Sequence, residues 1–295
     1  MLSGVQFVCF AASYGVALAL EVSRLFFRSG VRGAVMLGFA GAGLLAHTIF
    51  LADQVVDFYR TASPKASPLA SSQDWYLVAA WLLVVVYLYL TYFHPKVSFG
   101  VFILPLVLGL IGVARYVADP KPFPREPASR VWGAIHGTSI LLASVALLVG
   151  FVAGMMYLWQ VRRLKHKVPA QKGLRLPSLE WLQRANGRAI TIALVTVGIG
   201  ILSGMVLNAI NRGRDAGFVP WNDPVILSTV AMFGWLVVSS GLSLVYRPAR
   251  EGRRVAYLTV VSFIFLAIAL TFVLFRDTQH GGVRPVPPAA QGERA

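Results

Sequence analysis

Cysteine is nearly absent from this sequence, in which Cys9 is the only one among 295 residues. A chain with a single cysteine forms no intrachain disulfide, has no CxxC redox pair and holds no cysteine-based metal cluster. Thiol–disulfide exchange is therefore excluded as chemistry that this chain performs alone.

Charged residues are also scarce. They make up 13% of the chain, whereas 57% of its residues are hydrophobic, and a soluble domain carries about 25% charged residues. The net charge of +15 comes mainly from basic residues in short loops between apolar runs. In a membrane protein this pattern sets the orientation and attracts anionic headgroups. We therefore expect membrane lipids as partners and no nucleic acid.

Enzyme motifs are missing as well. The carboxylates are scattered over segment ends and loops, with no paired spacing for acid–base work. The sequence contains no Gly-rich phosphate loop, no HExxH and no GxSxG motif. We therefore expect a protein that is not an enzyme.

Apolar runs are abundant, and each is long enough to cross the ~30 Å of hydrocarbon in a bilayer. They cover approximately residues 5–27, 33–52, 75–93, 97–118, 132–159, 189–211, 225–246 and 255–275. The sequence thus predicts an all-α fold, one polytopic membrane bundle of about eight transmembrane helices over residues 1–279. Residues 280–295 are predicted to form a disordered tail. Loops are predicted over 53–74, which is polar, and 160–188, which is strongly basic.

The distribution of Lys and Arg predicts the orientation. An even number of crossings puts both termini on one side of the membrane. If that side is the outside, the inner segments hold 16 of the 27 Lys and Arg residues and the outer segments hold 11. Half of the inner set lies in the 160–188 segment. Since inner loops carry the excess of positive charge, both termini are predicted to be outside.

Histidines are the best candidates for chemistry. His47 and His136 lie on separate segments and are both predicted near the outer surface. Two imidazoles from facing helices can supply both axial positions of a haem iron, or nitrogen ligands of another metal. The alternative is that each is an ordinary structural histidine. His94, next to Pro95 near the inner surface, is either an interfacial capping residue or an intramembrane relay or ligand.

A stripe of small and polar residues marks the sixth segment. Gly200, Gly204, Asn208 and Asn211 recur at i, i+4, i+8 and i+11, so they share one helix face. The glycines predict close helix packing, as does the Gly150-x-x-x-Gly154 pair in the fifth segment. The two amides are predicted to point the same way near the outer mouth.

Four stretches resemble one family. They are Trp132-Gly133-Ala134-Ile135-His136, Tyr157 to Lys165, Leu176 to Leu182 and Thr196 to Gly204. Together they resemble the membrane family of cytochrome c assembly proteins that handle haem, the CcsA, CcmC and HemX type. The resemblance is clearest over residues 132–257.

The resemblance implies a site. In that family a Trp-rich outer loop lies against haem, and histidines that flank the loop are axial ligands. His136 and His47 would then ligate a non-covalent b-type haem, with Trp221 and Asp223 in the haem-facing loop. Asn208 and Asn211 would line the site beside that loop. The loop is degenerate here, since residues 220–224 keep one Trp and an Asp-Pro pair but lack the second Trp, the Lys and the Glu.

The resemblance also implies a function. It is that of a haem-binding or haem-delivering component of cytochrome c assembly in the bacterial cytoplasmic (inner) membrane. Its partners would be other cytochrome c assembly proteins and apocytochrome c, which must bring the thiols. The alternatives are a non-catalytic membrane scaffold of an assembly complex and a small-solute transporter, although the sequence shows no internal repeat typical of transporters.

Overall fold

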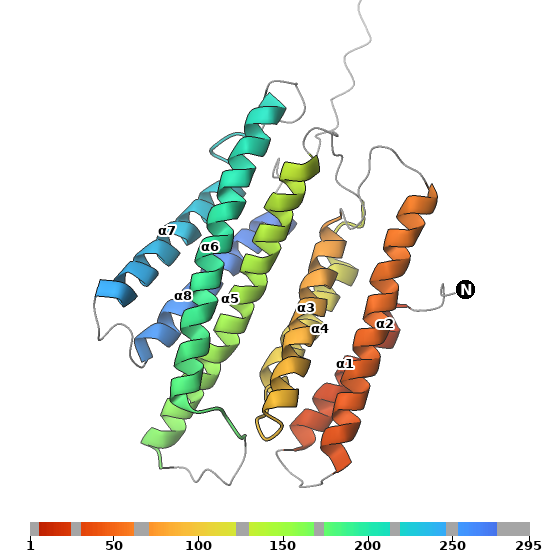
Figure 1. The fold of residues 1–295 in the computed structure, drawn as a ribbon, viewed down its shortest axis with the longest axis vertical. Helices are drawn as coiled ribbons and strands as arrows, with labels where there is room; N and C mark the ends of the chain where they lie inside the picture. Colours follow the sequence, from red (N-terminus) through yellow and green to blue (C-terminus); the bar gives the residue numbers. More distant parts are fainter. Residues whose placement is uncertain are drawn as a thin grey trace, which may run out of the picture.

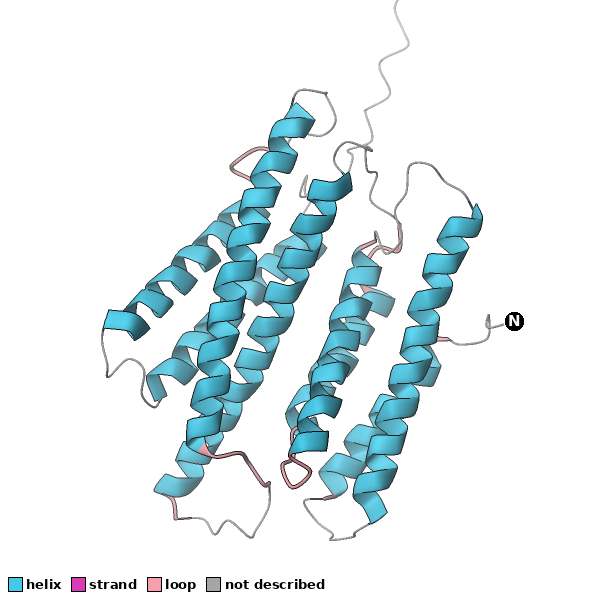
Figure 2. Ribbon diagram, in the orientation of Figure 1, coloured by secondary structure: helices cyan, strands magenta, loops and turns pink. Residues whose placement is uncertain are grey.

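A computed structural model describes residues 6–24, 31–61, 71–121, 130–167, 174–212, 219–245 and 253–275. Within these ranges the regular structure is entirely helical (Figure 2). The helices are α1 (Phe7–Ser23), α2 (Val31–Thr61), α3 (Ser72–Phe93), α4 (Gly100–Tyr116), α5 (Arg130–Lys165), α6 (Leu179–Arg212), α7 (Pro224–Val245) and α8 (Arg253–Phe275). The predicted tail, 280–295, lies outside the described residues.

Helix length and composition identify a membrane protein. In the described ranges, α2, α3, α5, α6 and α7 are long and apolar enough to cross a bilayer, and α1, α4 and the apolar part of α8 are shorter. The 17 residues of α1 or α4 rise about 25 Å, near the lower limit for a span. The predicted all-α polytopic membrane bundle is confirmed.

The helices form two groups of four. In the first half, α1 packs against α2 and α4, and α3 packs against the same two helices. In the second half, α5 packs against α6 and α8, and α7 against the same two. The halves meet along a seam where α3 and α4 contact α5 (Figure 1). Of the long spans, α5 and α3 are the most buried, at 56% and 44% of their apolar windows.

The two ends of the bundle differ in charge. The ends of α1, α3, α5 and α7 point to one end, drawn lowest in Figure 1, as do the starts of α2, α4, α6 and α8. We call it the basic end. Its described cations include Arg24, Arg32, Lys96, Arg162, Arg163, Lys165, Lys167, Arg175, Arg184 and Arg188. By the positive-inside rule this end is predicted to face the cytoplasm.

The predicted loop at 53–74 is wrong in its first part, because α2 continues as one helix to Thr61. Residues 53–61 contain no glycine or proline, so nothing in them breaks the helix. The first breaker is Pro64, and a helix normally ends before a proline. Hydropathy falls at Asp53, but falling hydropathy marks the edge of the hydrocarbon rather than the end of the helix.

The predicted basic loop at 160–188 is wrong at both ends. Helix α5 continues to Lys165, and α6 begins at Leu179 instead of near residue 189. Ser178 begins α6 by accepting a hydrogen bond from the backbone N–H of Trp181 (3.3 Å). The added turns bury Leu182 and Asn186, and the Asn186 carboxamide accepts a 2.6 Å hydrogen bond from Thr259 of α8. Polar contacts thus stabilise a helical stretch that hydropathy does not detect.

Glycines let α5 approach its neighbours. A Cβ atom at Gly150 would lie 2.8 Å from Cγ2 of Thr259 and 3.0 Å from Cβ of Ala189. At Gly154 it would lie 3.3 Å from the carbonyl oxygen of Ala256. The predicted close-packing face is confirmed, and it joins α5 to α6 and α8.

A buried ion pair connects α1 to the α3–α4 link at the basic end. Glu21 is fully buried, and its Oε2 lies 3.1 Å from Nη1 of Arg24. The same guanidinium donates to the carbonyl of Pro95 (2.8 Å). A Cβ atom at Gly100 would lie 2.9 Å from Cγ of Glu21. Arg24 thus pairs with one carboxylate oxygen and one backbone carbonyl, while Oε1 of Glu21 has no hydrogen-bond partner among the described residues.

Candidate functional site

His136 projects from the first turns of α5 toward α6. Its Nδ1 atom lies 2.8 Å from the carbonyl oxygen of Gly200. Because a carbonyl only accepts hydrogen bonds, Nδ1 must carry the proton, and in the neutral ring Nε2 then holds the lone pair. Metal-ligating histidines characteristically donate their second ring N–H to a carbonyl or carboxylate in this way. The half-buried ring is therefore oriented and in the tautomer that a ligand needs.

Glycines on both helices make this approach possible. A Cβ atom at Gly204 would lie 2.9 Å from Nδ1 and 3.0 Å from Cε1 of His136. On α5 itself, a Cβ atom at Gly137 would lie 2.8 Å from the Trp75 ring, which comes from the first turn of α3. The indole of Trp75 thus packs against α5 at Gly137, the residue after His136, from across the seam. In the sequence, the Gly137 that follows His136 is the sign of this close contact.

The segment 219–223 is attached to α6 one turn beyond the imidazole. The side chain of Asn208 forms two hydrogen bonds with the backbone of Val219, donating from Nδ2 and accepting at Oδ1, each at 3.0 Å. Asn208 follows Gly204 by one turn, so the loop anchor lies about 6 Å along α6 from the contact with His136. Trp221, in this loop, is 53% exposed. The structure therefore places His136, Asn208 and the Trp221 loop at the same end of one helix pair.

Asn211 and Asp223 have different surroundings. Asn211 is half-buried near the end of α6. Asp223 is 5% exposed, and its Oδ1 accepts a 2.9 Å hydrogen bond from the backbone N–H of Val225, at the start of α7. This is an N-cap, with Pro224 as the first helical residue, which is the usual place for that pair. Asp223 therefore fixes the junction between the loop and α7.

His47 lies elsewhere, between α1 and α2. It is fully buried, and its ring stacks on Phe10 with 4.3 Å between centroids and 3° between planes. Its Nδ1 is 3.4 Å from the hydroxyl of Tyr14. In the described part of the chain the buried Nε2 makes no hydrogen bond. The contacts that are present are those of a residue packed between helices.

Helix α3 gives the relative depth of the two histidines. Trp75 packs against Gly137, the residue after His136, whereas Trp81 donates a 2.8 Å hydrogen bond to Thr48, the residue after His47. Trp81 follows Trp75 by six positions, which corresponds to about 9 Å along α3. His47 is also in the first half and His136 in the second, with α3 between their helices (Figure 1). The structure does not bring the two imidazoles together.

His94 lies at the basic end, opposite His136. It is exposed and caps the C-terminus of α3, where its backbone N–H donates to the carbonyl of Leu90 (2.9 Å). Its ring makes an edge contact with Trp181, with centroids 5.7 Å apart. These contacts are those of an interfacial cap. Among the described residues, no three His, Cys, Asp or Glu side chains gather as metal ligands.

These features define a class, that of multi-pass helical membrane proteins with an oriented histidine near one membrane face, beside a tryptophan-bearing loop. Within this class, residues 72–280 match the family model of the cytochrome C assembly protein, and the chain belongs to that family. A comparison with curated proteins returns no match. The family region starts at the first residue of α3 and runs beyond α8. It includes His136, Asn208, Asn211, Trp221, Asp223 and His94. It excludes α1 and α2, the second of which carries His47.

Proposed function

We propose that this protein binds haem at the end of the bundle that carries His136 and holds it for transfer during cytochrome c assembly. Membership in the family supports a role in cytochrome c biogenesis. The observation that supports haem binding is the 2.8 Å contact between Nδ1 of His136 and the carbonyl of Gly200. It leaves Nε2 in the form that coordinates iron.

Haem is a large flat ligand that is apolar on both faces, and aromatic side chains lie near His136 on two sides. Trp75 lies on one side of α5 and α6 on the other, and Trp221 is exposed in the anchored loop one turn away. Aromatic rings offer wide apolar surfaces for stacking. In this proposal His136 ligates the iron and Trp221 covers the porphyrin. Asn208 and Asp223 hold the loop in place, and Asn211 lines the site.

A second axial ligand would have to come from another part of the chain. His47 is the candidate from the sequence, and its Nε2 has no hydrogen-bond partner in the described part of the chain. His47 lies beyond α3 and about 9 Å further along the bundle than His136. It can therefore reach an iron held by His136 only if α2 shifts relative to α3. His94, at the opposite end, is proposed as an interfacial cap or a relay, and not as a ligand of the same iron.

Haem is cargo in this scheme, and the chain performs no bond-making step. Covalent attachment of haem to a cytochrome uses cysteine thiols, and this chain has only Cys9. The thiols must therefore come from a partner, which we propose is apocytochrome c, with other assembly proteins presenting it. A bacterial cytoplasmic membrane with the His136 end outward would place the cargo where such an acceptor is assembled.

The test is spectroscopic. The full chain is purified in detergent, supplied with haem and titrated by its Soret absorbance. We expect His136→Ala to abolish the ligand-specific Soret shift, and His94→Ala to leave it unchanged. If His47 is the second ligand, His47→Ala converts a low-spin spectrum into a high-spin one. If it only packs between α1 and α2, the spectrum stays the same and thermal stability falls.

One result would reject the proposal. If the wild-type chain binds no haem, or binds it equally well after His136→Ala while remaining folded, His136 is not a ligand. Co-purification of assembly proteins without haem would then favour the scaffold function.

A further inference from the structure

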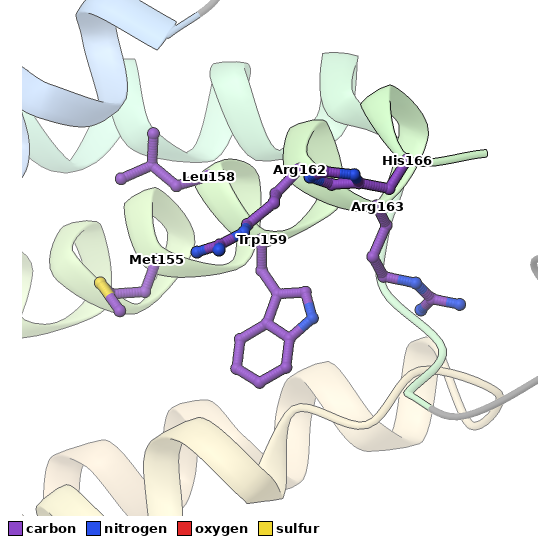
Figure 3. A pocket seen from close by; sticks show the side chains of 6 residues that line it. All are labelled: Met155, Leu158, Trp159, Arg162, Arg163 and His166. Carbon is purple, nitrogen blue, oxygen red and sulfur yellow. The ribbon is translucent and has the colours of Figure 1, made fainter. Parts of the chain in front are cut away.

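A second place on the molecule has the chemistry of a binding site. An open cavity of about 500 Å³ lies at the basic end of α5, lined by Met155, Leu158, Trp159, Arg162, Arg163 and His166 (Figure 3). Their spacing of i, i+3, i+4, i+7, i+8 and i+11 makes one stripe along the helix. The three residues nearer the middle of the bundle are apolar, and the three at the end are basic. The cavity is thus amphipathic along the direction that crosses a membrane.

The individual contacts show which side chains can meet a ligand. Trp159 is 48% exposed and meets Phe102 of α4 edge-on, with centroids 6.0 Å apart. Arg163 donates from Nη1 to the carbonyl of Leu174. Arg162 is exposed, and no carboxylate among the described residues pairs with it. Figure 3 shows its side chain running back along α5 past Leu158 and Trp159. Arg162 therefore brings a positive charge to the apolar wall.

A neighbouring cavity helps to select the stronger site. It has about 240 Å³ and is lined by Trp181, Arg184, Ala185 and Arg188 of α6. It combines a tryptophan with two arginines, but Arg184 lies 3.5 Å from Glu180, which partly neutralises it. The larger cavity holds more basic side chains and more apolar surface, so it is the better site for an amphipathic anion.

We propose that the α5 cavity binds one anionic glycerophospholipid, with the phosphate at Arg162 and His166 and an acyl chain along Leu158 and Met155. Arginine binds phosphate through charge-assisted hydrogen bonds, and basic clusters at the cytoplasmic ends of spanning helices attract anionic headgroups. Trp159 lies where the headgroup and acyl regions meet, which is the usual depth of tryptophan. A free phosphate would contact the cations but leave the apolar wall uncovered. A zwitterionic lipid would bring its own cation close to Arg162.

The test is native mass spectrometry of the full chain in detergent, with phosphatidylglycerol and phosphatidylcholine added in equal amounts. We expect one preferentially retained phosphatidylglycerol. The variant Arg162→Gln should weaken its binding about fivefold, the effect of one cation at a membrane surface, and Arg162→Gln with His166→Gln should weaken it further. Lys165→Gln is the matched control, because Lys165 is exposed on the same turn but does not line the cavity. It should change the binding less than twofold.

A second measurement uses Trp159 directly. Phosphatidylglycerol with brominated acyl chains should quench tryptophan fluorescence more than brominated phosphatidylcholine, and Trp159→Phe should remove that difference. The proposal is overturned if Lys165→Gln weakens binding as much as Arg162→Gln, since the attraction would then be diffuse. It is also overturned if excess inorganic phosphate displaces the lipid. The same holds if added haem displaces the lipid one for one from the wild type but not from Arg162→Gln.

Discussion

Gly204→Ala tests the role of His136 without touching the histidine itself. The added Cβ atom would lie 2.9 Å from Nδ1 and 3.0 Å from Cε1 of the imidazole. Ordinary contacts of this kind are about 3.4–4.0 Å, so the ring must move by roughly half an ångström or more. The hydrogen bond from Nδ1 to Gly200, now 2.8 Å, then lengthens or breaks.

The expected effect is much larger on haem binding than on folding. Loss of one hydrogen bond costs the fold about 1 kcal/mol, and alanine returns a similar amount through its better helix propensity. Loss of the group that orients a metal ligand typically lowers affinity about 10- to 100-fold. We therefore expect haem affinity to fall at least about tenfold in Gly204→Ala, with a melting temperature close to that of the wild type.

Gly187→Ala is the matched control, because it lies on the same helix and no atom is within 4 Å of its added Cβ. Haem titration by Soret absorbance and thermal unfolding in detergent are measured on both variants. In the background of His136→Ala, Gly204→Ala should have no further effect on haem. If Gly204→Ala binds haem as tightly as Gly187→Ala, the orienting contact is irrelevant and our reasoning about His136 fails.

Three further changes test the packing. Arg24→Met leaves the buried Glu21 carboxylate without its partner, so we expect the free energy of unfolding to fall by about 3–5 kcal/mol. Adding Glu21→Leu should restore part of the melting temperature. No recovery would mean that the loss does not come from the broken pair. Gly150→Ile should disrupt the contact of α5 with α8, where a Cβ atom already meets Thr259 at 2.8 Å. A Cβ atom at Gly109 would meet nothing within 4 Å, so Gly109→Ala should leave the melting temperature unchanged. Equal melting temperatures for Gly150→Ile and Gly109→Ala would contradict the close-packing face. Asn208→Ala removes both hydrogen bonds to Val219, so amide exchange in 219–223 should accelerate while α6 stays protected.

The sequence predicts the number and order of the helices because membrane burial needs long apolar runs. It predicts their ends less well. Residues 53–61 and 179–188 are helical but polar enough to lie outside the hydrocarbon, and hydropathy reports only the hydrocarbon. This matters for the candidate site, since His47 is 14 residues from the end of α2 rather than beside it.

The partners of each histidine were beyond prediction because they depend on which helix faces meet. The stack of His47 on Phe10 joins residues 37 positions apart, and the bond of His136 to Gly200 joins residues 64 apart. No local sequence pattern indicates contacts between residues so far apart in the chain. Asp223 is different, because an Asp-Pro pair before an apolar run is the usual start of a helix. The sequence therefore also indicated a helix-capping role for Asp223, besides the haem-facing role implied by the family resemblance.

The seam between the halves has a mechanical consequence for His136. Trp75 belongs to the first half, and Gly137, against which it packs, belongs to the second. A shear of one half past the other, of the small kind that packed helices allow, slides the indole across the helix that carries the imidazole. The bond between His136 and Gly200 lies wholly within the second half and travels with it. For the haem that we propose His136 binds, such a shear would move the aromatic surface next to the site, while the hydrogen bond that orients the imidazole stays the same.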